Sequence, residues 1–282
     1  MPVTTRKLWA KQLQAQYKVS ISLSCLASGV SRSAFYYEQK CSDDTEVIDV
    51  LNQIVQTHQR WGFPKCFKRI RALGHKWNHK RVYRIYTELK LNFRRKTKQR
   101  LPTRNPQPLI VPSKFGNTWS MDFMSDSLHN KVRFRTFNVI DDSNREVLGI
   151  DIGVGMPAER VIRYLDQLAA WHGYPTKIRV DNGSEFCSFI FTQWAENNNI
   201  FIDYIKPGCP YQNAYIERFN RTYRHEVLDL YIFYSLDEVR GITEKWIDTY
   251  NAERPHDSLN NLTPLEYKTR FLTNQDSTLS LC

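Results

Sequence analysis

The stretch that decides the fold lies at residues 177–186 and reads KIRVDNGSEF. A short β-rich run ends at Asp181, and the Asn-Gly pair that follows favours a turn. Open α/β sheets bind ligands at the carboxyl ends of their strands, so a carboxylate directly after a strand is a candidate for chemistry. The alternative interpretation is a plain turn, because Asp-Asn-Gly is also good turn chemistry.

Strand and helix patterns alternate on both sides of this stretch. The predicted strands lie at 118–124, 132–140, 146–152, 177–180 and 200–205, and the predicted helices at 158–171, 190–198, 213–228, 236–250 and 264–272. Three consecutive strands followed by alternating helices and strands predict an α/β domain with a mixed sheet flanked by helices.

The first of these strands carries a second carboxylate. It reads TWSMDFM, and strand alternation places Trp119, Met121 and Phe123 on one face and Asp122 on the other. A carboxylate in the middle of a strand is costly unless it is paired, hydrogen-bonded or bound to a cation. Asp122 is therefore a candidate ligand, and an exposed sheet face is the alternative.

A third carboxylate, Glu217, lies on the predicted helix at 213–228. The apolar stripe of this helix consists of four residues at helical spacing: Ile216, Phe219, Tyr223 and Val227. Glu217 shares a neighbouring face with Arg221 and Arg224. That face is either a solvated Glu–Arg pair, which is the common case, or a metal ligand with phosphate-binding arginines beside it. The spacing between Asp181 and Glu217 is weak evidence by itself.

The charge is divided unevenly along the chain. Residues 1–116 hold 23 Lys/Arg against 6 Asp/Glu, a balance of +17, whereas residues 117–282 hold 17 against 23, a balance of −6. A basic half followed by an acidic half indicates a polyanion-binding module joined to a part that needs carboxylates. A generally solvated basic surface would explain the net charge of +11 but not this asymmetry.

Two further classes of protein are disfavoured by the sequence. The apolar runs are too short to span a membrane, and the first ten residues do not form a secretory signal. The 6 cysteines form no Cys-x-x-Cys pair and fit reduced thiols in a cytoplasmic protein. A zinc site from His58, Cys66, His75 and His79 is disfavoured because its spacing matches no common finger.

The basic half is predicted to be helical and bipartite. Residues 1–40 form a helix-turn-helix, with a turn at Gly29 and a cap at Ser31, on the strength of Leu23, Leu26 and Val30 at helical spacing and a last helix running to Gln39. Residues 45–98 form a second helical DNA-binding module, in which Asn78 caps the last helix. Residues 99–115 form a Pro-rich basic linker, and the catalytic core with its C-terminal helices occupies 116–282.

Basic side chains in both modules are the candidate DNA contacts. Lys80, Arg81 and Arg84 lie on the outer face of the last helix of the second module and suit phosphate contact, with ordinary solubility as the alternative. Ser31 and Arg32, at the start of the second helix of the predicted helix-turn-helix, are the candidates in the first module.

Five stretches together resemble one family of proteins. They read WSMDF at 119–123, DNGSEF at 181–186, PGCPYQNAYIERFN at 207–220, NHKRVYR at 78–84 and GVSRSAFYY at 29–37, and YNAERPHDSL at 250–259 with Thr263-Pro264 adds a C-terminal signature. This pattern resembles the second-frame (OrfB-type) transposase of the insertion-sequence-three family, with its retroviral-integrase-like core. Ser184 departs from the family pattern, which usually has Pro after Asp-Asn-Gly.

The resemblance implies an RNase H-like fold in which Asp122, Asp181 and Glu217 converge as catalytic residues and metal ligands. It implies two Mg²⁺ ions per site, with Mn²⁺ as a substitute, and Arg221 and Arg224 on the DNA backbone. Hard divalent cations prefer carboxylate oxygens, and two of them can assist both the attacking and the leaving oxygen of a phosphodiester. Water attack would free a 3′-OH, which would then attack a second phosphodiester.

The implied partners are double-stranded DNA, as element terminal repeats and target, a second copy of the chain in a homo-oligomer, and the upstream-frame product of the same element. No sustained heptad repeat occurs in the sequence, so a zipper would lie outside it. Two alternatives stay open on the residues alone. One is a non-catalytic DNA-binding regulator, which the three carboxylates argue against, and the other is a metal-dependent nuclease that only hydrolyses.

Overall fold

The computed structural model describes residues 1–37, 43–93, 116–206 and 210–279. The chain divides into two compact units, Met1–Glu46 and Val47–Cys282. The predicted linker at 99–115 lies outside the described residues, and so does Gln39. Over the part that is described, no helix has both the length and the apolar character needed to cross a bilayer.

A mixed five-stranded sheet forms the centre of the second unit. Strands β1 (Thr118–Ser127), β2 (Arg133–Asp141) and β3 (Val147–Gly153) are antiparallel neighbours, and β4 (Lys177–Val180) and β5 (Phe201–Tyr204) run parallel to β1. The strand order is β3-β2-β1-β4-β5. Three antiparallel strands extended by two parallel ones, with helices between the parallel strands, are the RNase H-like fold, as the resemblance implies.

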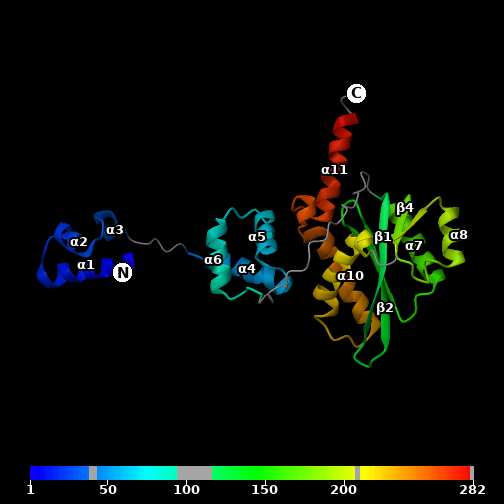
Figure 1. The fold of residues 1–282 in the computed structure, drawn as a ribbon, viewed down its shortest axis with the longest axis horizontal. Coiled ribbons are helices and arrows are strands. Elements are labelled where there is room, and N and C mark those ends of the chain that lie inside the picture. Colours follow the sequence, from blue (N-terminus) through cyan, green and yellow to red (C-terminus); the bar gives the residue numbers. More distant parts are fainter. Residues whose placement is uncertain (38–42, 94–115, 207–209, 280–282) are drawn as a thin grey trace. The chain divides into compact units, whose positions relative to one another are not determined.

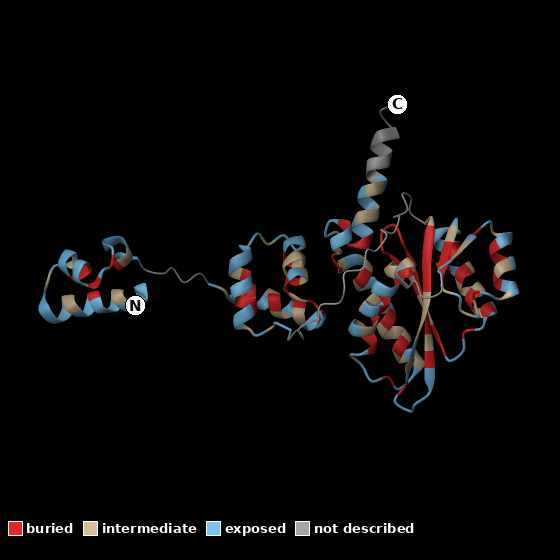
Figure 2. Ribbon diagram, viewed as in Figure 1, coloured by how far each residue is buried: buried red, intermediate tan, exposed pale blue. Residues whose placement is uncertain are grey.

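Helices cover both faces of this sheet. Helices α7 (Ala158–His172) and α8 (Phe189–Asn197) lie on one side, and α10 (Leu236–Glu253) lies on the other (Figure 1). Helix α9 (Ala214–Tyr223) packs with α10 in the same apolar cluster. Burial is concentrated in the strands and the inward faces of these helices (Figure 2). The sheet is thus a wall between two cores.

Strand alternation sends the side chains of β1 into both cores. Trp119 and Met121 are completely buried against α7 and α8, whereas Met124 packs with the α9–α10 cluster. Because residues two apart in a strand share a face, Asp122 lies on the α9–α10 side, as alternation predicts. Strand β1 continues to Ser127, three residues beyond the predicted end at residue 124. These polar residues pair with Arg133–Arg135 of β2.

The predicted helix at 213–228 changes its winding along its length. A 3₁₀ turn (Pro210–Asn213) precedes α9, and a π-helical turn (Arg224–Leu228) follows it. The predicted apolar stripe is confirmed, because each of its four members is at most 2% exposed: Ile216, Phe219, Tyr223 and Val227. After α10 the chain forms a 3₁₀ turn (Asp257–Leu259) and α11 (Pro264–Leu279).

The first unit contains α1 (Val3–Tyr17), α2 (Ile21–Ser28) and α3 (Arg32–Tyr36). Its core is small: Ala10, Cys25, Val30 and Phe35. Leu23 and Leu26, which have helical spacing with Val30 in the sequence, are both exposed, and α2 buries Ser24, Cys25 and Ser28 instead. The two serine hydroxyls donate to carbonyls of their own helix, so small polar side chains are satisfied at this close contact. The last helix ends at Tyr36, before the predicted Gln39.

Helices α4 (Thr45–Thr57), α5 (Phe63–Ala72) and α6 (His79–Glu88) follow and share one apolar cluster. Asn78 caps α6 as predicted, since its side chain accepts a bond of 2.8 Å from the backbone N–H of Lys80. Cys66 is fully buried, and burial raises the pKa of its thiol to about 11. A thiol of this kind is a poor zinc ligand. No zinc cluster occurs among the residues that the structure describes.

Candidate active site

Asp122 is held in the middle of β1 by a hydrogen bond to each carboxylate oxygen. Oδ1 accepts from the backbone N–H of Phe123 at 2.8 Å, and Oδ2 accepts from the side-chain amide of Asn220 at 2.7 Å. Burial, together with the negative charges of Asp181 and Glu217, raises the pKa of Asp122 to about 6, against these two hydrogen bonds. The three carboxylates named from the sequence are therefore near enough to interact electrostatically.

Asp181 follows the last residue of β4 and also forms the predicted turn. Its Oδ1 accepts from the backbone N–H of Gly183 at 3.0 Å, and the side chain of Asn182 donates to the carbonyl of Ile205 at 2.9 Å. The loop is thus tied to the end of β5. Turn formation and proximity to Asp122 occur together here, so the two interpretations of Asp181 do not exclude each other.

Glu217 is exposed in the first turn of α9, next to the buried Ile216. Partial burial raises the pKa of Glu217, and the positive charge of Arg221 opposes this shift. The negative charge of Glu217 acts on Asp122, and among the described residues no arginine lies at hydrogen-bond distance from Glu217. These surroundings leave the carboxylate oxygens of Glu217 able to accept a further ligand.

The three carboxylates do not form a closed metal site. In the described ranges of the chain, no three acidic, histidine or cysteine side chains lie close enough together to hold a metal ion. The donor chemistry nevertheless fits a hard divalent cation, because all three groups are carboxylates and each Asp122 oxygen accepts only one protein hydrogen bond. The charges repel one another, as the pKa of Asp122 indicates, and a cation would relieve this repulsion.

Two asparagines behind Asp122 were not among the predicted site residues. Asn220 donates to Asp122, and its Oδ1 accepts from the Nδ2 of Asn138 at 2.7 Å. Asn138 is completely buried and stands opposite Asp122 in the β1–β2 register. A polar residue inside the apolar run of β2 was the available sequence signal for Asn138, and the position of Asn220 one turn after Glu217 was the signal for the other.

An arginine on β2 was also missed. Arg135 forms an ion pair with Glu185 and lies over the ring of Phe123 at 4.2 Å from its centroid. Burial would raise the pKa of Glu185, but the hydrogen bonds from Arg135 and Ser184 hold it below its usual value. Arg135 therefore connects the loop that carries Asp181 to the residue that follows Asp122.

The two arginines predicted to hold DNA near the carboxylates differ from each other. Arg221 is exposed on α9. Arg224 lies at the start of the π-helical turn, where it donates to Asp126 at 2.7 Å and to the carbonyl of Ser125 at 2.7 Å. A phosphate at Arg224 would therefore have to share or replace these partners.

The candidate DNA contacts in the helical modules lie on exposed or partly exposed positions. Ser31 caps α3 by accepting from the backbone N–H of Ala34 at 3.2 Å, and Arg32 beside it is exposed. Lys80 and Arg84 are exposed on α6, Arg81 is partly exposed, and Arg84 also bonds to Glu88 at 3.0 Å. Their DNA contacts stay predictions.

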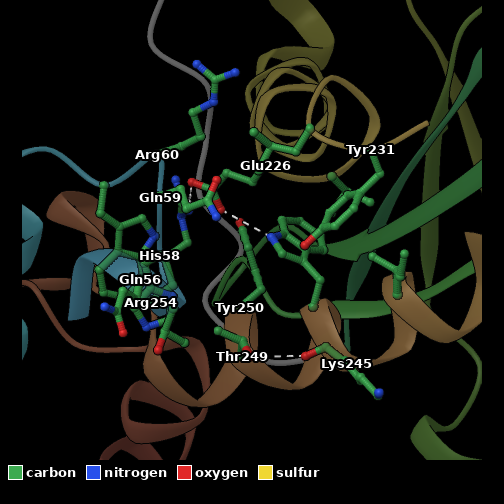
Figure 3. A pocket seen from close by; sticks show the side chains of 16 residues that line it. Gln56, His58, Gln59, Arg60, Glu226, Tyr231, Lys245, Thr249, Tyr250 and Arg254 are labelled. Carbon is green, nitrogen blue, oxygen red and sulfur yellow. Dashed lines mark hydrogen bonds and ion pairs between the residues drawn. The ribbon is translucent and has the colours of Figure 1, made fainter. Parts of the chain in front are cut away.

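A cavity of about 370 Å³ lies elsewhere in the second unit. Residues 56–61 line one part of it, and the rest is lined by residues between 226 and 231, by α10 and by Arg254 directly after α10 (Figure 3). Glu226 inside it is already bonded to Trp246 at 3.2 Å and ion-paired with Arg254. None of the three candidate carboxylates lines this cavity, so it is not the candidate active site.

Comparison with known families agrees with the fold. Two models described as integrase core domain match residues 112–210 and 198–264, and a model described as HTH-like domain matches residues 42–99. Together the two core models span the whole sheet and helices α7 to α10.

Several curated relatives are products of bacterial insertion elements. A protein of insertion element IS476 from Xanthomonas euvesicatoria is 37% identical over 89% of this chain and 73% of its own length. A protein of insertion element IS407 from Burkholderia multivorans is 35% identical over 92% of this chain and 95% of its own length. Transposase InsF for insertion sequence IS3A from Escherichia coli is 24% identical over 91% of this chain and 96% of its own length.

Solved structures show a partial likeness. An intasome of simian T-cell lymphotropic virus matches over 77% of this chain and 73% of that chain, at 16% identity and a TM-score of 0.46. The HTLV-2 integrase catalytic core in complex with magnesium matches over 54% of this chain and 94% of that chain, at 18% identity and a TM-score of 0.40. Because the relatives from IS476 and IS407 are 37% and 35% identical over 89% and 92% of this chain, the chain belongs to the insertion-sequence-three family of transposases.

Proposed function

We propose that this transposase is an Asp-Asp-Glu enzyme, in which Asp122, Asp181 and Glu217 are the metal ligands for DNA strand cleavage and strand transfer. The observation that carries the proposal is the environment of Asp122. Its pKa lies near 6 because it is buried beside two further negative charges, and such a group is stabilised by a bound cation.

The proposed cofactor is Mg²⁺, two ions per site, with Mn²⁺ able to replace it. When bound, the ions would supply charge stabilisation at the attacking and leaving oxygens of a phosphodiester. The carboxylates of this chain would hold the ions beside the reacting ends. Water attack would release a 3′-OH at the element end, and this hydroxyl would attack a second phosphodiester. Following the family, the first joining would link one element end to the other in a circular intermediate.

DNA would be held by charges from several parts of the chain. Arg221 and Arg224 are the proposed backbone contacts beside the carboxylates, and Lys80, Arg81 and Arg84 are those of the second module, with Ser31 and Arg32 in the first. Neutralising phosphates releases counterions, so binding by residues 1–100 should fall steeply as salt rises. Charge reversal of Lys80, Arg81 and Arg84 together should weaken binding on every sequence tested.

The working species is proposed to be an oligomer that pairs two DNA ends, and the upstream-frame product of the element is a further proposed partner. The reaction joins two ends, while one active site acts on one strand at a time. The aromatic side chains of α10 are not free for self-association, because Tyr250 is buried and Trp246 packs against it at 5.1 Å between ring centroids. The mass of the paired-end complex during joining tests this, and a single protein copy would contradict it.

The catalytic proposal is tested with the purified full-length chain, labelled duplexes that carry the ends of its own element, and Mg²⁺. The wild type should give joined product. Asp122→Asn should give none while binding the duplex with unchanged affinity, because the substitution removes charge but not size. The matched control is Asp248→Asn, the same change at an exposed position of α10, which should join at the wild-type rate.

Each other outcome identifies an alternative. Hydrolysed ends without joined product would indicate a nuclease, and binding without any cleavage would indicate a regulator. If Asp122→Asn joins DNA as well as the wild type, the assignment of the metal ligands is wrong.

A further inference from the structure

The side chain of Asn138 is buried where an apolar residue would be expected. It faces the α9–α10 side of the sheet, in the same alternation as Phe134 and Ile140, which pack in the apolar cluster there. Asn138 is 0% exposed, and its Oδ1 has no hydrogen-bond partner among the described residues. A buried polar atom without a partner costs free energy, so this amide lowers the stability of the core that contains it.

The side-chain hydrogen bond of Asn138 leads, through Asn220, to Asp122. Its Nδ2 donates to the Oδ1 of Asn220 at 2.7 Å, and the Nδ2 of Asn220 donates to the Oδ2 of Asp122 at 2.7 Å. Asp122 and Asn138 are cross-strand partners, and Asn220 of α9 bonds to both of them. Hydrogen bonds therefore join the three side chains in series, and these side chains come from β2, α9 and β1.

The direction of this chain is determined by Asp122. An ionised carboxylate only accepts hydrogen bonds, so Asn220 must turn its amide nitrogen toward it and its oxygen away. That oxygen then needs a donor, and the amide nitrogen of Asn138 supplies one. If Asn138 were absent, the amide of Asn220 would lose its support on one side and could rotate about its last torsion, which is broad for asparagine.

We propose that Asn138 is a positioning residue for strand transfer, which acts through Asn220 to hold the carboxylate of Asp122 in one orientation. This inference rests on the proposed role of Asp122 as a metal ligand. Partners that orient metal-binding groups typically change metal affinity or activity by about 10–100-fold when they are removed. Asn138 would then lower the stability of the core, because its buried amide is incompletely bonded, but fix the orientation of the Asp122 carboxylate.

The test compares three variants with the full-length wild type. Asn138→Leu keeps the branched shape of the side chain and removes the donor, and Asn138→Ala serves in its place where the larger leucine prevents folding. Thr136→Val is the matched control, because Thr136 is equally buried on the same strand and the same face and its hydroxyl has no partner in the described structure. Thermal unfolding of each variant shows which of them are folded.

The first readout is binding of Mn²⁺ to the metal-free protein, measured by calorimetry or by water-proton relaxation. Asn138→Leu should bind Mn²⁺ about 10–100-fold more weakly than the wild type. Thr136→Val should bind it with wild-type affinity. A purely structural role for Asn138 would lower stability but leave the metal affinity of the folded protein unchanged, and that result would overturn the proposal.

The second readout is a double-mutant cycle in the joining assay, scored by the Mn²⁺ concentration that gives half-maximal rate. Because Asn138 acts through Asn220, the double variant Asn138→Leu with Asn220→Ala should need no more Mn²⁺ than Asn220→Ala alone. Effects that multiply would show that the two residues act independently, and the proposal would fail.

The same titration separates this inference from the function on which it rests. If Asp122→Asn binds Mn²⁺ as tightly as the wild type, the proposed function is wrong whatever Asn138 does. If Asp122→Asn loses Mn²⁺ but Asn138→Leu keeps it within about twofold, the proposed function stands and only the positioning role is refuted.

Discussion

The two faces of the central sheet are built from the same two strands but differ in chemistry. On the α7–α8 side, β1 and β2 contribute Trp119, Met121, Phe137 and Val139, all completely buried. On the α9–α10 side, the alternate positions of the same strands hold Asp122, Thr136 and Asn138 among the apolar residues. The first face is packed mainly with apolar side chains, whereas the second combines apolar packing with a hydrogen-bonded carboxylate.

This difference separates stability from chemistry. Close packing of large apolar side chains dominates the α7–α8 face, where the indole N–H of Trp119 is buried without a partner among the described residues. The α9–α10 face retains buried polar atoms without partners, Thr136 Oγ1 and Asn138 Oδ1, which lower stability. Sites that hold reacting groups commonly give up stability in this manner. The comparison predicts that substitutions in the apolar α7–α8 core lower stability without affecting joining. Substitution of a site carboxylate on the α9–α10 face should instead affect joining without lowering stability.

The largest expected effect is the loss of joining in Glu217→Gln. Removing one of three anionic ligands should lower the rate of strand transfer by roughly 10⁴-fold, equivalent to about 5 kcal/mol in activation free energy. The stability of the metal-free protein should be unchanged or raised, since partial burial already disfavours the charged form of Glu217. Single-turnover joining and denaturant unfolding measure the two quantities.

The matched control for this change lies on the opposite side of the sheet. Glu196→Gln alters an exposed glutamate of α8 and should leave both joining and stability at wild-type values. If the two variants join DNA equally well, the face that we assign to chemistry is not the catalytic one.

The next effect is one of stability alone. Phe137→Ala should remove a completely buried ring from the α7–α8 core and lower the free energy of unfolding by about 3–5 kcal/mol. Its joining rate per folded molecule should stay near that of the wild type, because Phe137 points away from Asp122. Urea unfolding measures the free energy of unfolding, and titration of the active fraction gives the joining rate per folded molecule. A fall of a hundredfold in the rate of the folded fraction would mean that the two faces are coupled.

The strands of the core were predictable from the sequence because alternation and turn residues are local signals. The prediction for β4 at 177–180 agrees with the structure, and the helices of the core begin within one residue of their predicted starts. Strand β1 was cut short because Ser125–Ser127 are polar. Their pairing with β2 is a backbone interaction that hydropathy does not record.

Other features depend on tertiary neighbours. Leu23 and Leu26 fit a helical stripe, but α2 packs through its small residues, so helical spacing alone does not identify the buried face. The π-helical turn after Tyr223 places Arg224 beside Asp126, which a uniform 3.6-residue period does not describe. In the site, motifs indicated the three carboxylates, but Asn138 has meaning only once β2 is paired with β1.

The third prediction concerns acid sensitivity on the α9–α10 side. His256 packs edge-on against Tyr250, a member of that core, at 5.1 Å between ring centroids. Burial, together with the positive charges of Arg254, Lys65 and Arg145, lowers the pKa of His256 to about 3. The unfolded chain, with the ordinary value of 6.5, therefore takes up a proton that the folded protein excludes. Stability is complete above pH 6.5 and falls as the pH decreases toward 3.

This effect should disappear in His256→Phe, which keeps a ring against Tyr250 but cannot titrate. Between pH 7 and pH 5 the wild type should lose about 2 kcal/mol more unfolding free energy than the variant. Phe137→Leu on the other face is the control, and its difference from the wild type should not change with pH. Urea unfolding at several pH values measures this, and parallel curves for wild type and His256→Phe would contradict the assignment.

The smallest expected effect distinguishes a tolerated polar group from a useful one. Thr136 and Asn138 are both completely buried on the same face of β2, and each leaves one oxygen unpaired among the described residues. Thr136 belongs to no hydrogen-bonded chain that reaches Asp122, so Thr136→Val should raise the free energy of unfolding by about 1 kcal/mol at unchanged joining rate, because it removes an unpaired hydroxyl. Asn138→Leu removes an unpaired oxygen as well, but it also takes the donor from Asn220 Oδ1, so it should gain no stability and should lose metal affinity. Urea midpoints and Mn²⁺ titrations on the two variants test the contrast. If Thr136→Val loses stability instead, its hydroxyl has a partner, and the α9–α10 face is better satisfied than the comparison requires.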